Sequence, residues 1–118
     1  MNFNEYQKLA QRTSNTKCSV SKLINGVMGL NSESGECIDL IKKNEFQGHS
    51  LDINKLIDGL GNVLWYIAET CEGIGVTIED VARHNIVKLK KRYPEGFEAD
   101  RNIYIEIYIE ETEELKNE

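Results

Sequence analysis

Cysteine and histidine are scarce in this chain of 118 residues, which holds three cysteines and two histidines. Cys18, Cys37 and Cys71 are odd in number and include no C-x-x-C pair. This spacing argues against a disulfide framework and against a thiolate zinc site. No second histidine lies at ligand spacing from His49. We therefore expect a reduced protein whose chemistry does not depend on cysteine or histidine ligands.

Long hydrophobic runs and an excess of positive charge are also missing. No uncharged stretch reaches membrane-spanning length, and the opening MNFNEYQK lacks an apolar signal core, so we expect a cytoplasmic protein. The net charge of -6 and the pI near 5.0 argue against nucleic acid and anionic membranes as partners. An anion bridged by a metal remains compatible with this charge.

The apolar residues recur mainly at helical spacing, and the chain length suits a single domain. A domain of this size gains core by self-association, so we expect an oligomer. The fold class that we predict is all-α, with four to five helices in a bundle. Four helices are expected at about residues 4–13, 20–43, 52–71 and 78–93. Thr77, with Asp80 three residues later, is a predicted N-cap, and the single proline, Pro94, ends the fourth helix.

The character of the sequence changes after residue 97. Residues 103–110, IYIEIYIE, alternate strictly between isoleucine and Tyr or Glu, which predicts a β-strand. A lone strand needs a partner for its backbone groups, so we expect pairing with the same strand of a second chain. A short amphipathic helix is the alternative. The predicted domain therefore covers residues 1–97, and residues 98–118 form a strand and an acidic tail.

The stretch GLNSESGECIDLIKK contains two carboxylates, Glu33 and Glu36, three residues apart in the second predicted helix. Side chains three apart share a helix face, so both point the same way. They border an apolar stripe formed by Val20, Leu23, Val27, Leu30, Cys37 and Ile41. Adjacent negative charges favour a cation between them, and Mg²⁺ prefers such oxygen ligands. A solvated polar edge is the alternative, and the spacing alone favours it.

Three glycines, Gly26, Gly29 and Gly35, interrupt the same predicted helix. Each weakens a helix by about 1 kcal/mol relative to alanine. Close packing against a neighbouring helix or a ligand is one reason to keep them.

The third predicted helix carries one apolar stripe and one tryptophan that points away from it. The stripe consists of Ile53, Leu56, Ile57, Leu60, Leu64, Ile67 and Cys71. Trp65 lies off this stripe, which indicates a second buried surface. In a small domain, we expect that surface to be a subunit interface.

The fourth predicted helix combines an amide with two cations. Asn85 falls inside its apolar stripe, and Lys88 and Arg92 flank the stripe. Together they form a possible cradle for phosphate. The alternative is a hydrogen-bonded core amide with cations that complement the helix C-terminus, and by itself this is the better supported interpretation.

Several segments agree, in order and spacing, with one known family. NEYQKLA, the E-x-x-E of GLNSESGECIDLIKK, KLIDGLGNVLWYIAETC and TIEDVARHNIVKLKKRYPEGF resemble the MazG-like branch of the all-α nucleoside-triphosphate pyrophosphohydrolases. The resemblance covers residues 4–97. It implies an α-helical protein that assembles as dimers or tetramers. It also implies a Mg²⁺-dependent cleavage of an NTP or dNTP to the monophosphate and pyrophosphate.

The resemblance assigns Glu33 and Glu36 to the first half of the family's metal site. The second half, an E-x-x-D on the next long helix, falls on Gly59 and Asn62, so both of its acids are missing here. Mg²⁺ has little affinity for sites without anionic oxygens, although Asn62 still offers a neutral carbonyl oxygen. Asp58, one helical turn before Asn62, is a possible replacement ligand, and the triphosphate itself also brings oxygens.

If turnover occurs, the resemblance implies in-line attack of a metal-held water on the α-phosphorus. Lys88 and Arg92 would then neutralise the leaving phosphates, Asn85 would orient a phosphate or a metal-bound water, and Lys55 is a further phosphate ligand. Three functions remain open at this stage. The first is an active but altered pyrophosphohydrolase, the second is a nucleotide-binding protein without catalysis, and the third is a helical assembly module with a vestigial pocket.

Overall fold

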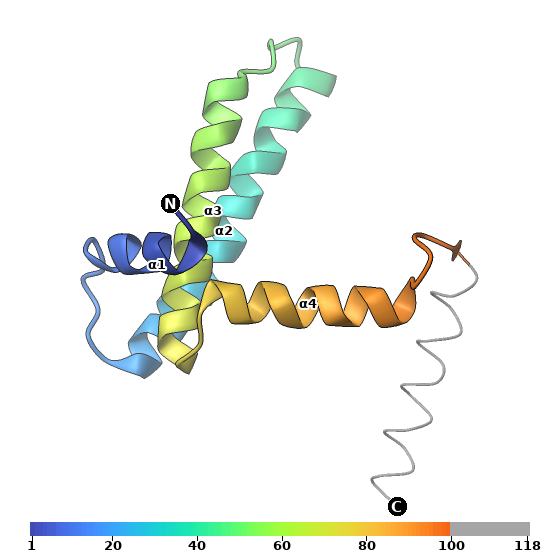
Figure 1. Ribbon diagram of the computed structural model, residues 1–118. Coiled ribbons are helices and arrows are strands. Elements are labelled where there is room, and N and C mark those ends of the chain that lie inside the picture. The colour runs from blue at the N-terminus through green and yellow to red at the C-terminus, as the bar shows by residue number, and fades with distance from the viewer. Residues whose placement is uncertain (100–118) are drawn as a thin grey trace, which may run out of the picture. The chain divides into compact units, whose positions relative to one another are not determined.

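The computed structural model describes residues 1–99, and these residues form an all-α structure (Figure 1). Four helices follow one another: α1 (Phe3–Gln11), α2 (Ser19–Phe46), α3 (Ile53–Ile74) and α4 (Ile78–Arg92). The predicted fold class is thereby confirmed. The strand predicted at residues 103–110 lies outside the described residues.

The chain divides into two compact units, of which the first is Met1–Asp80 and the second begins at Val81. The first unit contains α1, α2 and α3, and α2 and α3 lie side by side along most of their length (Figure 1). The two helices run in opposite directions, because Gly26 near the start of α2 faces Thr70 near the end of α3. The first unit is therefore an antiparallel helical hairpin with α1 packed against α3.

Local signals explain where the helices begin and end. The Asp52 side chain accepts a hydrogen bond from the backbone N–H of Lys55 and caps α3. Gly75 ends α3 with a φ of 75°, a left-handed conformation that glycine adopts without strain. Thr77 and Asp80 exchange reciprocal hydrogen bonds of 3.0 Å at the start of α4. The predicted N-cap is confirmed as a capping box.

Glycine allows the close approach of α2 to α3. A methyl group at Gly26 would lie 2.7 Å from the backbone nitrogen of Thr70, and one at Gly29 would overlap the ring of Tyr66. Gly35 has open space around it. Close packing therefore explains Gly26 and Gly29 but not Gly35. Despite all three glycines, α2 is one helix of 28 residues.

We expect Gly26→Ala to lower the free energy of unfolding by about 1–3 kcal/mol, because its methyl group meets the backbone of α3. Gly35→Ala on the same helix is the matched control. It should raise stability by up to about 1 kcal/mol, since alanine favours helix and nothing obstructs its methyl group. Urea unfolding followed by circular dichroism measures both changes. Equal effects of the two substitutions would contradict this close packing.

The buried core of the first unit is small and lies where α1 meets α3. Its buried apolar side chains are Ala10, Ala68, Cys71 and Ile78. Partly buried apolar side chains pack around it, namely Tyr6, Leu64, Trp65, Ile67 and Val76. The core is therefore built on the C-terminal half of α3.

The apolar stripes predicted on the second and third helices are only partly buried. Val20 and Val27 on α2, and Ile53, Ile57 and Leu60 on α3, are all at least half exposed. The prediction that these stripes form core is therefore wrong for a single chain. The physical reason is that two helices bury only their mutual contact, and α1 covers only part of α3.

Trp65 does lie on a second buried surface, as its position off the stripe predicted, but that surface belongs to the same chain. Its indole Nε1 donates hydrogen bonds to the carbonyl oxygen of Ala10 (3.1 Å) and to Oγ1 of Thr13 (2.8 Å). The structure therefore gives Trp65 hydrogen-bond partners within its own chain. The end of α1 occupies the place that we assigned to a second chain.

Candidate functional site

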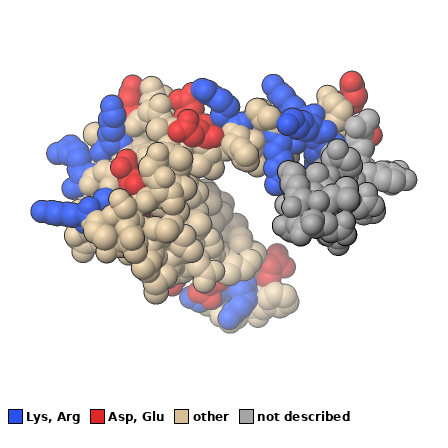
Figure 2. Space-filling model, turned by 90° about the horizontal axis from the view of Figure 1, so that it is seen from below, with Lys and Arg blue, Asp and Glu red and all other residues tan. Residues whose placement is uncertain are grey.

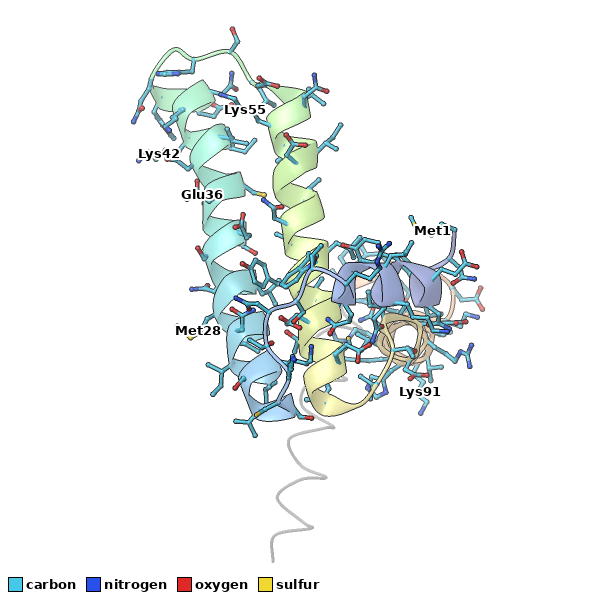
Figure 3. The ribbon with its side chains drawn as sticks, turned by 90° about the vertical axis from the view of Figure 1, so that its left-hand side faces the viewer. Met1, Met28, Glu36, Lys42, Lys55 and Lys91 are labelled. Carbon is cyan, nitrogen blue, oxygen red and sulfur yellow. The ribbon has the colours of Figure 1, made fainter. Side chains whose placement is uncertain are left out.

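The carboxylates predicted as metal ligands line a hollow of about 420 Å³ between α2 and α3. Glu33 and Glu36 project from α2, and Lys55, Asp58 and Asn62 project from α3. Glu33 is partly buried and Glu36 is exposed. Figure 3 labels Glu36 on α2 and Lys55 near the start of α3. The fold thus brings together residues up to 29 positions apart, which the resemblance had grouped.

The two helices are joined across this hollow by a hydrogen bond. Nδ2 of Asn62 donates to Oε2 of Glu33 at 3.2 Å. An amide N–H therefore faces the carboxylate at the position where the resemblance places an aspartate. The amide gives Glu33 one hydrogen bond but no positive charge.

Gly59, the second missing acid, lies against a thiol. A methyl group at position 59 would be 2.8 Å from Sγ of Cys37 on α2. Cys37 and Gly59 both line the hollow, and Cys37 is partly buried. The thiol thus limits the space for any side chain at position 59, which the sequence pattern did not reveal.

The donor set does not form a complete metal site. Among residues 1–99, no group of three or more His, Cys, Asp or Glu side chains is arranged so that it can hold a metal ion. Glu33 and Glu36 supply anionic oxygens from one side, while Asn62 presents an N–H to Glu33. A resident Mg²⁺ needs anionic oxygens from several directions. These residues therefore do not fit a metal that is held before the nucleotide binds.

One end of the hollow carries an ion pair. Nζ of Lys43 lies 2.8 Å from Asp39 on the same helix. The hydrogen bond to Lys43 lowers the pKa of Asp39, and the same hydrogen bond raises the pKa of Lys43, which Glu36 raises further by its charge. Lys43 and Lys55 therefore place two cations beside the carboxylates. Sequence reasoning missed Lys43, whose signal was its position four residues after Asp39.

A second hollow, of about 360 Å³, shares Glu33 and Asn62 with the first. Its other lining residues are Thr13, Trp65 and Tyr66. The two aromatic rings meet edge to face, with centroids 5.0 Å apart. The two hollows therefore share a boundary at Glu33 and Asn62, with charged groups in one and aromatic rings in the other. Sequence reasoning did not place Thr13, Trp65 or Tyr66 at a binding site, because Thr13 is far in the sequence from the two aromatic residues on α3.

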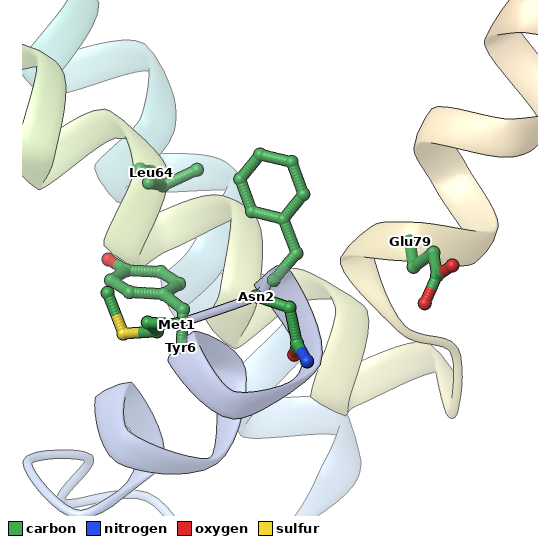
Figure 4. A pocket seen from close by; sticks show the side chains of 6 residues that line it. Met1, Asn2, Tyr6, Leu64 and Glu79 are labelled. Carbon is green, nitrogen blue, oxygen red and sulfur yellow. The ribbon is translucent and has the colours of Figure 1, made fainter.

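A further hollow of about 460 Å³ lies beside the start of α1 (Figure 4). Met1, Phe3, Tyr6 and Leu64 make most of its lining apolar. Glu79 contributes a carboxylate, which accepts a hydrogen bond from Nδ2 of Asn4 at 3.0 Å. Its lining residues include no lysine or arginine. It therefore lacks the charged groups expected of a phosphate site.

The predicted phosphate cradle lies on α4, in the second unit. Asn85, Lys88 and Arg92 follow one another at spacings of three and four residues, so they share a helix face. Figure 2 shows Lys and Arg side chains gathered along this helix, whose last turn also contains Lys90 and Lys91.

A buried carboxylate, Glu69, lies two turns beyond Asn62 on α3. Its side chain has no exposure to solvent. It accepts hydrogen bonds from Gln11, Ser14, Thr16 and Asn25, and it lies 3.4 Å from Nζ of Lys22. Burial raises the pKa of Glu69, but the hydrogen bonds from Gln11, Ser14 and Asn25 and the charge of Lys22 outweigh it, so the net pKa is lowered. Glu69 is therefore a buried anion, and only the folded structure revealed its partners.

Residues 23–97 match the family model described as the MazG nucleotide pyrophosphohydrolase domain. The matched segment is more than half of the chain and contains both sides of the first hollow. The chain belongs to this family, as the resemblance predicted. Members of the family act on nucleotides and generally use a divalent metal. Searches of curated proteins and of solved structures gave no match.

Across residues 1–99, no helix is long and apolar enough to cross a membrane.

Proposed function

We propose that this protein is a nucleotide pyrophosphohydrolase that converts an NTP or dNTP to the monophosphate and pyrophosphate. The observation that carries the proposal is the hollow between α2 and α3, which brings Glu33 and Glu36 together with Lys43 and Lys55. Carboxylates bind the cation that accompanies a triphosphate, and lysines bind its oxygens directly. The family to which the chain belongs supports the same activity. The proposed domain comprises residues 1–97, with 98–118 as an appended tail.

The substrate in this proposal is the Mg²⁺ complex of the nucleotide, because residues 1–99 offer too few anionic ligands for a resident ion. Glu33 and Glu36 are the side chains that would contact this ion, with Asp58 and the carbonyl of Asn62 as further oxygens. Slow turnover is the expected consequence. A metal that is held on one side only stabilises the developing charge less well than a complete site does.

The reaction is a displacement at the α-phosphorus. A water oxygen forms a bond to this phosphorus while the bond to the oxygen that bridges it to the β-phosphorus breaks. The water proton passes to Glu33 or Glu36, and pyrophosphate leaves with the bonding electron pair. Lys43 and Lys55 bind phosphate oxygens. Lysine side chains carry a positive charge at neutral pH, so they stabilise the negative charge that develops on pyrophosphate as it leaves.

The second hollow suits the other end of the same molecule. Trp65 and Tyr66 offer aromatic surface for a base or a ribose, and Thr13 offers a hydroxyl group. Glu33 and Asn62 line both hollows. A nucleotide whose phosphates lie in the first hollow would therefore have its nucleoside at the second hollow. Asn85, Lys88 and Arg92, which share one face of α4, are proposed as further phosphate-binding residues.

A nucleotide-binding protein without hydrolysis is the second candidate. The hydrogen bond from Asn62 to Glu33 favours it, because an amide occupies the place of a metal-binding acid. Binding needs only the hollows and their lysines, whereas turnover needs a well-held cation. Such a protein would sense or sequester nucleotides.

The function is tested by incubating the pure protein with a panel of NTPs and dNTPs plus Mg²⁺ and measuring pyrophosphate release. Glu33→Gln is expected to lower the rate by about a hundredfold, since it removes a metal-binding charge and a proton acceptor. Glu45→Gln, at an exposed position on the same helix, is the matched control and should act like the unaltered chain. Release that EDTA or Glu33→Gln leaves unchanged would refute this assignment.

If no pyrophosphate is released, calorimetric titration with the same nucleotides decides between the candidates. Binding that Glu33→Gln weakens, without turnover, supports the second candidate. An absence of binding refutes both the enzyme and the nucleotide-binding protein. The helical assembly module is then the remaining function.

We also propose that the chain associates with itself as a dimer or tetramer. Apolar side chains on both long helices are exposed in a single chain, and Met28 on α2, 69% exposed, points away from α3 (Figure 3). Burying them against a second copy would enlarge a small core. Analytical ultracentrifugation should give two or four times the chain mass of 13.5 kDa. A sedimenting species of one chain at micromolar concentration would exclude stable association.

A further inference from the structure

Two side chains of α3, one helical turn apart, reach the same short connection between α1 and α2. Trp65 donates to Ala10 and Thr13, and Glu69 accepts hydrogen bonds from Gln11, before Thr13, and from Ser14, after it. Thr13 itself donates a hydrogen bond of 2.8 Å to the carbonyl oxygen of Ala10. The connection that forms one wall of the second hollow is therefore attached to α3 at two successive turns.

Glu69 makes more hydrogen bonds to this part of the chain than Trp65 does. Oγ of Ser14 lies 2.9 Å from both of its carboxylate oxygens, and Nε2 of Gln11 lies 3.1 Å from one of them. Oγ1 of Thr16 is 3.4 Å away. A single buried carboxylate thus binds residues both before and after Thr13, which restricts the path of the backbone at Thr13.

The end of α1 has little else to hold it. Its buried residues are Gln7 and Ala10, Tyr6 is partly buried against the core, and Phe3 and Leu9 are about half exposed. One turn before the end of α1, Gln7 accepts a hydrogen bond from the backbone N–H of Ile78. Polar contacts therefore supplement the small apolar core in holding α1 and the following connection on α3.

We propose that Glu69 is a positioning residue for the nucleotide site: by holding Gln11, Ser14 and Thr16, it places Thr13 against Trp65 and so shapes the hollow that receives the nucleoside. This proposal rests on the proposed function for the identity of the ligand. Glu69 does not line either hollow at Glu33. It acts through the connection, and it touches neither nucleotide nor metal.

Lys22 and Asn25 complete the arrangement from α2. Nζ of Lys22 contacts Gln11 Oε1 at 2.6 Å and Ser14 Oγ at 3.2 Å, in addition to Glu69. Nδ2 of Asn25 donates to Glu69 at 3.1 Å. Glu69 therefore receives donors from three directions, and an uncharged amide at position 69 would turn an N–H toward some of them.

The test uses the single tryptophan of the chain, Trp65, as a reporter. In Glu69→Gln we expect a red-shifted emission and stronger quenching by acrylamide, under conditions where circular dichroism shows unchanged helix content. Glu45→Gln is the matched control, an exposed glutamate on α2 that should leave both signals unchanged. This arm of the experiment needs no nucleotide.

The ligand arm titrates the same variants with Mg²⁺ complexes of α,β-imido analogues of ATP, GTP, CTP and UTP. Glu69→Gln should raise the Kd by about tenfold and leave the Mg²⁺ concentration for half-maximal binding unchanged, because the carboxylates of the first hollow are untouched. A merely unstable protein would instead lose bound nucleotide in proportion to its unfolded fraction.

Unchanged Trp65 emission and quenching in folded Glu69→Gln would overturn the proposal, and so would altered emission with unchanged nucleotide affinity. If Glu69→Gln fails to fold, Ser14→Ala replaces it, since it removes the contact to both carboxylate oxygens and leaves Lys22 in place. The same outcomes are then expected, at smaller size. If the unaltered chain binds no nucleotide, the proposed function fails, and the fluorescence arm alone decides whether Glu69 positions Thr13.

Discussion

The triple variant Gly59→Glu, Asn62→Asp and Cys37→Ala is expected to release pyrophosphate at least about a hundredfold faster than the unaltered chain. The two new carboxylates would face Glu33 and Glu36 across the hollow and complete the oxygen ligands that Mg²⁺ requires. Cys37→Ala is included because the thiol would lie only 2.8 Å from Cβ of a side chain at position 59. The Asn62→Asp substitution also removes the amide that now donates to Glu33.

Calorimetric titration with Mg²⁺ in the absence of nucleotide provides a readout that does not depend on turnover. The triple variant should bind the ion, and the unaltered chain should bind it only weakly. Cys37→Ala alone is the control and should change neither quantity. Gly59→Glu without Cys37→Ala should be less stable than the triple variant, since overpacking costs about 1–3 kcal/mol. A folded triple variant that binds no Mg²⁺ would refute the assignment of Gly59 and Asn62 to the metal site.

Lys22→Met is expected to lower the free energy of unfolding by about 2–4 kcal/mol at neutral pH. Lys22 lies 3.4 Å from a carboxylate that is fully buried, and its own side chain is only 16% exposed. Removal of one partner leaves Glu69 charged, buried and without a counter-ion, which is far more costly than the loss of a surface pair. Thermal and urea unfolding measure the change.

Lys42→Met is the matched control on the same helix. Lys42 is 60% exposed and lies 4.0 Å from Asp39, so its loss should have little effect on the free energy of unfolding. A Lys22→Met variant as stable as Lys42→Met would show that the Glu69 cluster does not need the cation.

Acid weakens the same cluster. The folded-state pKa of Glu69 lies below its ordinary value of 4.5, so the cluster contributes its full stability above that value and loses it as the pH falls through the folded pKa. In Glu69→Gln, this part of the acid sensitivity should be absent.

The sequence by itself determined the helices, because each depends on neighbours along the chain. Apolar spacing located all four within a few residues, and Thr77 with Asp80 marked the start of α4. The grouping of Glu33, Glu36, Lys55, Asp58 and Asn62 was also predicted, but from the resemblance to a family. Residue spacing alone favoured a solvated edge for the two glutamates.

Only the tertiary structure decided what lies opposite each of these side chains. It placed α1 over Trp65, where we had expected a second chain, and it left the predicted stripes of α2 and α3 partly exposed. It also placed Cys37 beside Gly59 and enclosed Glu69 among donors from the connection after α1 and from α2. Contacts between distant segments depend on how closely and at what register the helices pack. Helical periodicity shows which face of a helix is apolar, but it carries no information about which surface covers that face.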